Sequence, residues 1–149
     1  MTDIVTIHGL DEFEAQLKRL GDKARSEKIL DSLEAGGRVI QIYAQDNVRT
    51  KLNRHPTGNL VNNIDVRKEG KIILVGAWGT VYAKIHEFGG VITPIKAKML
   101  HFFVDGVEVF AKRVSIPARP YLRPAVDEHM PEIEQAVSDA MRGLLEEAL

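Results

Sequence analysis

The spacing of the apolar residues changes in kind at a turn cluster, "RHPTGN", that covers residues 54–59. Before it, apolar residues keep a period of about 3.6 residues from about Lys23 to Leu52, which predicts a long helix. A shorter helix is predicted over Leu10–Leu20, after a short strand at Val5–Gly9. After the cluster, apolar residues alternate or form short runs, as they do in strands. Helices and strands that follow one another in blocks predict an α+β fold.

Two glycines, Gly36 and Gly37, interrupt the long helical pattern. Each costs a helix about 1 kcal/mol relative to alanine. Such a pair marks either a kink or a place where another backbone comes close, and the sequence leaves both alternatives open.

Strand-like runs follow the turn cluster. The first two are "NIDVRK" and the apolar run "KIILVGAW", which we expect to be buried. The next two, "MLHFFV" and "VEVFAKRV", flank Asp105 and Gly106, a residue pair that a two-residue type I′ hairpin turn prefers. We expect these runs to form one small antiparallel sheet.

Three prolines stiffen the segment "IPARPYLRP", Ile116–Pro124. The first two hold it extended because the residue before a proline is pushed out of the α region, whereas Pro124 suits the first turn of a helix. A final amphipathic helix follows, in which Pro131 marks a kink or a restart. Its apolar stripe comprises Ile133, Val137, Met141, Leu144 and Ala148. No linker or repeat divides the chain, so we expect a single domain over residues 1–149.

The composition limits the chemistry and the location that we expect. The chain lacks cysteine, so it offers no disulfide, thiolate metal ligand or cysteine nucleophile, which fits a reducing cytoplasm. No apolar run approaches the roughly 18 residues of a membrane span, and no signal peptide is visible. We therefore expect a soluble cytosolic protein with no membrane partner. The charge is uneven, because residues 127–149 carry seven acidic side chains and one basic one, whereas the whole chain has a net charge of −1.

His86 and Glu87 are the residues that most resemble a catalytic or metal-binding pair. A zinc-protease helix of the form "HExxH" needs a second histidine one turn later, and that position is Gly90. The other histidines are scattered, and no serine nucleophile elbow, phosphate-binding loop or dinucleotide motif occurs. A local hydrogen-bonded corner is therefore favoured over a reactive site. The sequence predicts no catalytic residue, cofactor or metal ion.

A nucleic-acid surface is one alternative, because bases stack on aromatic side chains beside basic residues. The chain offers Lys96, Lys98, Lys112, Arg113, Arg119 and Arg123 as the basic residues, with Phe102, Phe103 and Tyr121 as the aromatic ones. The aromatic residues lie among apolar neighbours, and the net charge is close to zero, so core packing is favoured over base stacking.

The segment Val91–Met99 is irregular and carries no catalytic set of residues. Loops of this kind that stay in a compact domain are functional or mobile. We expect this loop to be exposed and mobile in the isolated subunit and to be ordered by a partner.

Three stretches occur in the order "HPTGNL", "VYAKIHEFGGVITP" and "KAKMLHFFVDGVEVFAKRVSIPARPYLRPA", before a final amphipathic helix. Together, over about Thr57–Leu145, they resemble the virion morphogenesis and tail-completion (neck) proteins of tailed bacteriophages. The resemblance implies a non-enzymatic α+β protein that forms a homo-oligomeric ring at the head-to-tail junction. It implies contacts with head-tail connector proteins and with tail tube or tail terminator proteins, while DNA passes through without sequence-specific binding. It also implies assembly in the host bacterial cytoplasm and a place in the virion.

The resemblance assigns a structural corner to Tyr82, His86, Glu87, Phe88, Gly89 and Gly90. Together with the uneven charge, it suggests a subunit interface between basic and acidic residues. The candidates are Lys96, Lys98, Arg113, Arg119, Arg123, Asp127 and Glu128. A tail-completion protein, a head-side adaptor and a minor tail protein all fit, and the face that would line the lumen stays open. The alternative function is a nucleic-acid-associated or enzymatic small domain.

Overall fold

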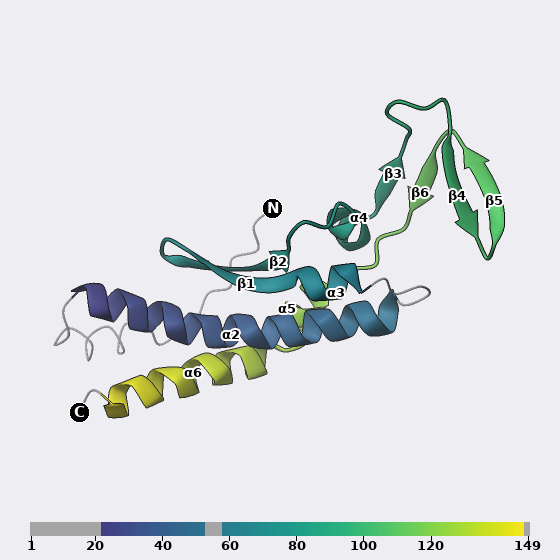
Figure 1. Cartoon of the computed structure of the whole chain (residues 1–149). Helices are drawn as coiled ribbons and strands as arrows, with labels where there is room; N and C mark the ends of the chain where they lie inside the picture. Colours follow the sequence, from purple (N-terminus) through teal and green to yellow (C-terminus); the bar gives the residue numbers. More distant parts are fainter. Residues whose placement is uncertain (1–21, 53–57, 148–149) are drawn as a thin grey trace.

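The computed structural model describes residues 22–52 and 58–147 (Figure 1). The predicted strand at Val5–Gly9 and helix at Leu10–Leu20 lie outside the described residues, as does most of the turn cluster at 54–59. The longest element is helix α2 (Asp22–Lys51), which confirms the long helix predicted from the apolar spacing.

Helix α2 forms the middle layer of the body (Figure 1). On one side lies the antiparallel hairpin of β1 (Ile64–Glu69) and β2 (Ile72–Ala77). On the other side lies helix α6 (Met130–Glu147), which runs antiparallel to α2. The long helix is therefore packed from two directions.

Gly36 and Gly37 make this double packing possible. A Cβ atom added at Gly36 would lie 2.7 Å from Cγ2 of Val137 in α6, and one at Gly37 would lie 2.9 Å from Cγ1 of Val66 in β1. Carbon atoms repel one another at these distances, so a larger residue would push the layers apart. Of the two predicted alternatives, α2 shows the close approach and continues through both glycines as one helix. Mainly side chains, rather than another backbone, come close.

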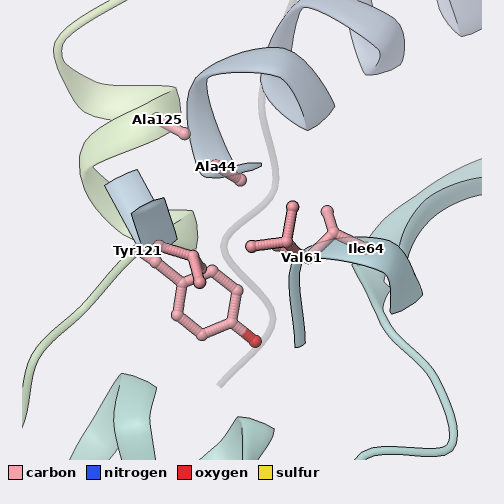
Figure 2. Close-up of a cluster of buried hydrophobic side chains, with 6 residues drawn as sticks. Ala44, Val61, Ile64, Tyr121 and Ala125 are labelled. Carbon is pink, nitrogen blue, oxygen red and sulfur yellow. The ribbon is translucent and has the colours of Figure 1, made fainter. Parts of the chain in front are cut away.

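The main apolar core lies beside the C-terminal half of α2 (Figure 2). The short helix α3 (Asn59–Asn63) contributes Val61, and Tyr121 packs against this group with 1% of its surface exposed. The side-chain amide of Asn47 donates a hydrogen bond of 3.0 Å to the carbonyl oxygen of Tyr121, so α2 also holds the backbone there. The buried members of this cluster are Ala44, Val48, Val61, Ile64, Tyr121 and Ala125.

The described strands form three separate two-stranded antiparallel sheets, so the prediction of one sheet is wrong. After β2 the chain turns into helix α4 (Ala83–Phe88), which separates the first hairpin from the later strands. Strand β3 (Gly90–Ile92) then pairs with β6 (Val114–Ile116). The remaining two strands lie between β3 and β6 in the sequence. That pair consists of β4 (Leu100–Val104) and β5 (Val107–Ala111).

Residues 90–116, which we call the arm, extend away from the body (Figure 1). The strands of the arm have their main contacts within their own pairs rather than with α2 or α6. At the end of the arm, Val104 pairs with Val107 around a two-residue turn. Asp105 and Gly106 have φ angles of 50° and 81°, which confirms the predicted turn because type I′ needs a positive φ at both positions.

The C-terminal elements follow the predicted pattern. Helix α5 (Leu122–Asp127) begins after Tyr121 and has Pro124 in its first turn. Helix α6 starts anew with Pro131 as its second residue, so this proline marks a restart. Ile133 and Val137 are buried, Met141 and Leu144 are half-buried, and Ala148 lies outside the described residues. The α+β fold class, the Asp-Gly hairpin and the C-terminal amphipathic helix are thus confirmed. No helix in the described part of the chain is both long and apolar enough to span a membrane.

Candidate assembly surfaces

Glu87 ties the root of the arm to the start of α5. Its Oε2 atom accepts hydrogen bonds from the backbone nitrogens of Tyr121 (2.8 Å) and Leu122 (3.0 Å). Its Oε1 atom accepts a third from the backbone nitrogen of Arg123 at 3.0 Å. The first backbone N–H groups of a helix have no partner within the helix, so a carboxylate from another element satisfies them. Both oxygens of Glu87 are therefore engaged in holding two parts of the fold together.

Gly89 lies at a second point of contact with the same segment. Its φ of 69° and ψ of −177° fall in a region that is essentially restricted to glycine. A Cβ atom there would lie 2.7 Å from the backbone nitrogen of Ala118 and 2.9 Å from the carbonyl oxygen of Ile116. Gly90 has a φ of 155° and opens β3. Position 89 therefore needs glycine for two reasons, its backbone angles and the lack of space for a Cβ atom.

His86 faces the proline segment as well. Its carbonyl oxygen accepts a hydrogen bond of 2.7 Å from the backbone nitrogen of Arg119. Burial, and secondly the charge of Arg119, lower the pKa of His86 below its usual value. Burial, and secondly the charge of Glu87, raise the pKa of Tyr121 to about 12. Among the described residues, no group of three or more histidine, aspartate or glutamate side chains is placed to hold a metal ion.

Five of the six residues assigned to the corner divide into two groups, and the sixth, Gly90, opens β3. His86, Glu87 and Gly89 contact the proline segment, as described above. Tyr82 and Phe88 instead expose 62% and 70% of their surface. The residues that the resemblance places in one structural corner thus present two large aromatic side chains to solvent.

Exposed apolar side chains are concentrated in and around the arm. Twelve large apolar residues are exposed in the described part of the chain, and ten of them lie between Val81 and Phe110. The prediction that the aromatic residues belong to the core holds for Tyr121 but is wrong for Phe103, which is 65% exposed. The ten are Val81, Tyr82, Phe88, Val91, Ile95, Met99, Phe103, Val104, Val107 and Phe110.

The β4–β5 hairpin has two faces of different character. On one face His101 pairs with Glu108 at 2.7 Å and stacks on Phe110, with ring centroids 4.8 Å apart. Phe103 lies beside His101 on this face, with ring centroids 5.3 Å apart. Strand alternation and register place only apolar residues on the other face. They are Leu100, Phe102, Val104, Val107, Val109 and Ala111.

The predicted loop Val91–Met99 is shorter than expected, because its first two residues belong to β3. Residues 93–99 form no helix or strand, and all of them except Lys98 line an open hollow together with Leu100 and His101. Ile95 is 97% exposed, and Lys96 and Lys98 are exposed too, which agrees with the predicted exposure of the loop. Its mobility stays a prediction.

The seven residues proposed for a charged interface are all exposed, but they do not form one surface. Lys96, Lys98 and Arg113 belong to the arm, whereas the other four lie next to or within α5. Arg123 and Asp127 form an ion pair within the chain at 3.6 Å. The arm group and the α5 group are therefore two separate charged regions.

Sequence reasoning did not find the exposed apolar residues of the arm. A usable signal was present, since both the odd and the even positions of β4–β5 include large apolar residues. A two-stranded hairpin that buries only one face would show apolar residues on that face alone. Apolar residues on both faces of such a pair indicate that something else covers the second face.

Comparison with known proteins identifies a family. The match covers residues 11–89 and the family is described as "HK97-gp10_like: Bacteriophage HK97-gp10, putative tail-component". The matched residues end in the α4 region, so the arm and the C-terminal helices lie beyond them. No curated protein and no solved structure matches the chain. The match spans more than half of the sequence, and the chain belongs to the HK97-gp10-like family of bacteriophage tail components.

Proposed function

We propose that this protein is a structural subunit of the phage head-to-tail junction or tail, where copies form a ring that helps to join or complete the tail. The family supports a structural role in the phage tail. The observation that carries the proposal is the set of ten exposed apolar side chains between Val81 and Phe110. Large exposed apolar surface indicates an interaction site.

The arm is built in a way that favours such a contact. A two-stranded hairpin is marginally stable by itself in water, and it gains stability when further strands or helices cover an apolar face. In the isolated subunit Phe103 and Val107, on opposite faces of the hairpin, are each 65% exposed. Neighbouring subunits in a ring would cover this surface, and would also order the loop at 93–99.

The charges of the body suggest how subunits are oriented. Arg119 and Arg123 lie at the start of α5, whereas the outer surface of α6 carries acidic side chains such as Glu132, Glu134 and Asp139. Charges at the rim of an interface set its orientation and encounter rate more than its affinity. An acidic α6 that faces the lumen is the rival use of these charges, because it would repel DNA phosphates and allow the genome to slide through.

In the proposed role the protein is not an enzyme and needs no cofactor. Glu87 is the obvious acid in the "IHEFGG" motif, and its two oxygens hold three backbone N–H groups. The proposed partners are other copies of the chain, head-tail connector proteins and tail tube or tail terminator proteins. The protein would assemble in the host cytoplasm and remain in the virion.

DNA binding by the arm is the second candidate, because Phe103 and Phe110 are exposed on an arm that also carries Lys96, Lys98, Lys112 and Arg113. Glu108 pairs with His101 beside the two phenylalanines, and a carboxylate there would repel phosphates. Gel-shift titration with single-stranded and duplex DNA at low salt distinguishes the candidates. Micromolar binding that weakens steeply with salt would favour the DNA role.

Location in the particle tests the proposed function. Gold-labelled antibodies raised against the purified protein should decorate purified phage particles at the head-to-tail junction or along the tail. A protein that is absent from purified particles, or that is found only inside heads, would overturn the proposal. Tails purified without heads serve as the control that separates a tail position from a head-side position.

A further inference from the structure

The turn of the β4–β5 hairpin presents apolar and acidic side chains together. Phe103, Val104 and Val107 are exposed there, and Asp105 and Glu108 lie among them. We call these five residues the tip patch. Lys96, Lys98, Lys112 and Arg113 lie nearer the other end of the β4–β5 ladder. The tip therefore combines exposed apolar surface with negative charge.

A second exposed apolar surface lies at α4. Val81, Lys84 and Phe88 follow one another at three- and four-residue spacing, so they share one side of this turn and helix. Val81 is 89% exposed and Phe88 is 70% exposed, and Tyr82 lies between them. We call Val81, Tyr82, Lys84 and Phe88 the α4 patch. This surface combines apolar area with positive charge.

We propose that the tip patch of one copy docks on the α4 patch of a second copy of this chain. Each surface supplies apolar area, and the acids of the tip complement Lys84 of the α4 patch. In a single copy the turn of the β4–β5 hairpin and α4 lie apart (Figure 1). The proposal rests on the proposed function, in that it requires copies of the chain to contact one another.

The pairing of two different surfaces has a geometric consequence. Each copy offers its tip to one neighbour and its α4 patch to another, which is a heterologous contact, and such contacts close into a ring when the rotation between copies allows it. Helix α6 is a poorer receptor for the tip, because Glu134 and Asp139 on its outer surface would face Asp105 and Glu108. The basic residues of the arm are left free to meet other partners.

Disulfide trapping tests this contact, and the natural chain has no cysteine to interfere. Val107→Cys places a thiol in the tip patch, Val81→Cys places one in the α4 patch, and Glu134→Cys places one on α6 as a control. All three positions are exposed, so the variants should fold. Two chains of different length, one tagged, are produced together in an induced host that lacks its own copy of the gene, and the purified particles are then oxidised.

The proposal predicts a mixed disulfide dimer from Val107→Cys with Val81→Cys. It predicts none from either variant alone or from Val107→Cys with Glu134→Cys. If particles contain several copies but the tip is trapped on α6, on another tip or on nothing, the tip-to-α4 contact is wrong while the proposed function stands. If purified particles contain no copy of the chain, the proposed function fails and the contact fails with it.

Charge exchange provides an independent test. Glu108→Lys and Lys84→Glu should each slow assembly of the purified protein onto tails roughly tenfold at low salt, and the chain with both changes should recover. His101→Gln is the matched control, because it removes the His101–Glu108 pair without reversing the charge of the tip. Recovery in the double variant with normal assembly of His101→Gln supports the contact. Additive loss in the double variant would overturn it.

Discussion

The carboxylate of Glu87 lies 2.8 Å from the backbone nitrogen of Tyr121, across 34 residues of sequence. The two residues flank the arm, since Glu87 precedes its first strand and Tyr121 follows its last. The same carboxylate also accepts hydrogen bonds from Leu122 and Arg123. This contact closes the root of the arm and fixes where the arm leaves the body.

Replacement of Glu87 by glutamine should destabilise the protein. The new amide NH₂ group would face backbone N–H donors that need an acceptor, and loss of hydrogen bonds to a charged group costs about 1–3 kcal/mol of unfolding free energy. Urea unfolding measures this cost. Glu134→Gln, at an exposed position of α6, is the matched control and should change the unfolding free energy little. Equal stability of the two variants would contradict the role given to Glu87.

Valine at Gly89 should be more harmful than valine at Gly90. Both glycines have positive φ angles, and a strained backbone costs on the order of 1–3 kcal/mol for an ordinary residue. Only Gly89 lacks space in addition, because the nearest atom to a Cβ at Gly90 is Cδ1 of Ile85 at 3.6 Å. Thermal melts of the two valine variants rank their losses of stability. His86→Gln, a milder change at the same corner, should cost less stability than either. A harmless valine at both positions would show that the corner is not a tight turn.

Alanine should have opposite effects at Gly36 and Gly143. Both glycines lie in helices, and alanine is favoured there by about 1 kcal/mol. Nothing lies within 4 Å of a Cβ added at Gly143, so Gly143→Ala should stabilise the protein. Gly36→Ala would force the new methyl group against Val137, and overpacking costs about 1–3 kcal/mol. Denaturant melts that ranked Gly36→Ala as the more stable variant would contradict the packing of α2 on α6.

Stability should fall as the pH falls through the titration of His86. The pKa of His86 is lowered by burial and by Arg119, so the unfolded chain takes up this proton at a higher pH than the folded chain does. The contribution of neutral His86 is complete above its unfolded pKa and is lost as the pH falls towards the lower, folded value. Melting temperatures from about pH 8 down to about pH 5 measure this loss. His86→Gln should reduce the slope, and an unchanged slope would contradict the burial of the imidazole.

The sequence predicts the elements whose pattern is local. The period of about 3.6 residues identifies α2 and α6, because a helix buries one stripe of its surface wherever it lies in the fold. Asp105 and Gly106 identify their turn, because a positive φ at two successive residues restricts the residue types. The α+β class follows from these elements.

Long-range contacts and exposure could not be predicted in this way. Nothing in the spacing of Glu87 indicates that it accepts hydrogen bonds from residues 121–123. The apolar neighbours of Phe103 predict a place in the core, whereas Phe103 is exposed in the arm. Periodicity reports that a side chain is apolar, but it does not report whether the covering surface belongs to the same chain. The three separate sheets have a related origin, since α4 and the loop at 93–99 redirect the chain between strands that look alike in sequence.

Deletion of the gene in an infected or induced host, followed by electron microscopy of the lysate, tests the structural role most directly. We expect separate full heads and tails, few joined particles, and a return of joined, infectious particles when the wild-type chain is supplied from a plasmid. A chain with Arg119→Glu and Arg123→Glu should fold but restore joining less well than the wild-type chain. Joined and fully infectious particles in the absence of the gene would contradict the account.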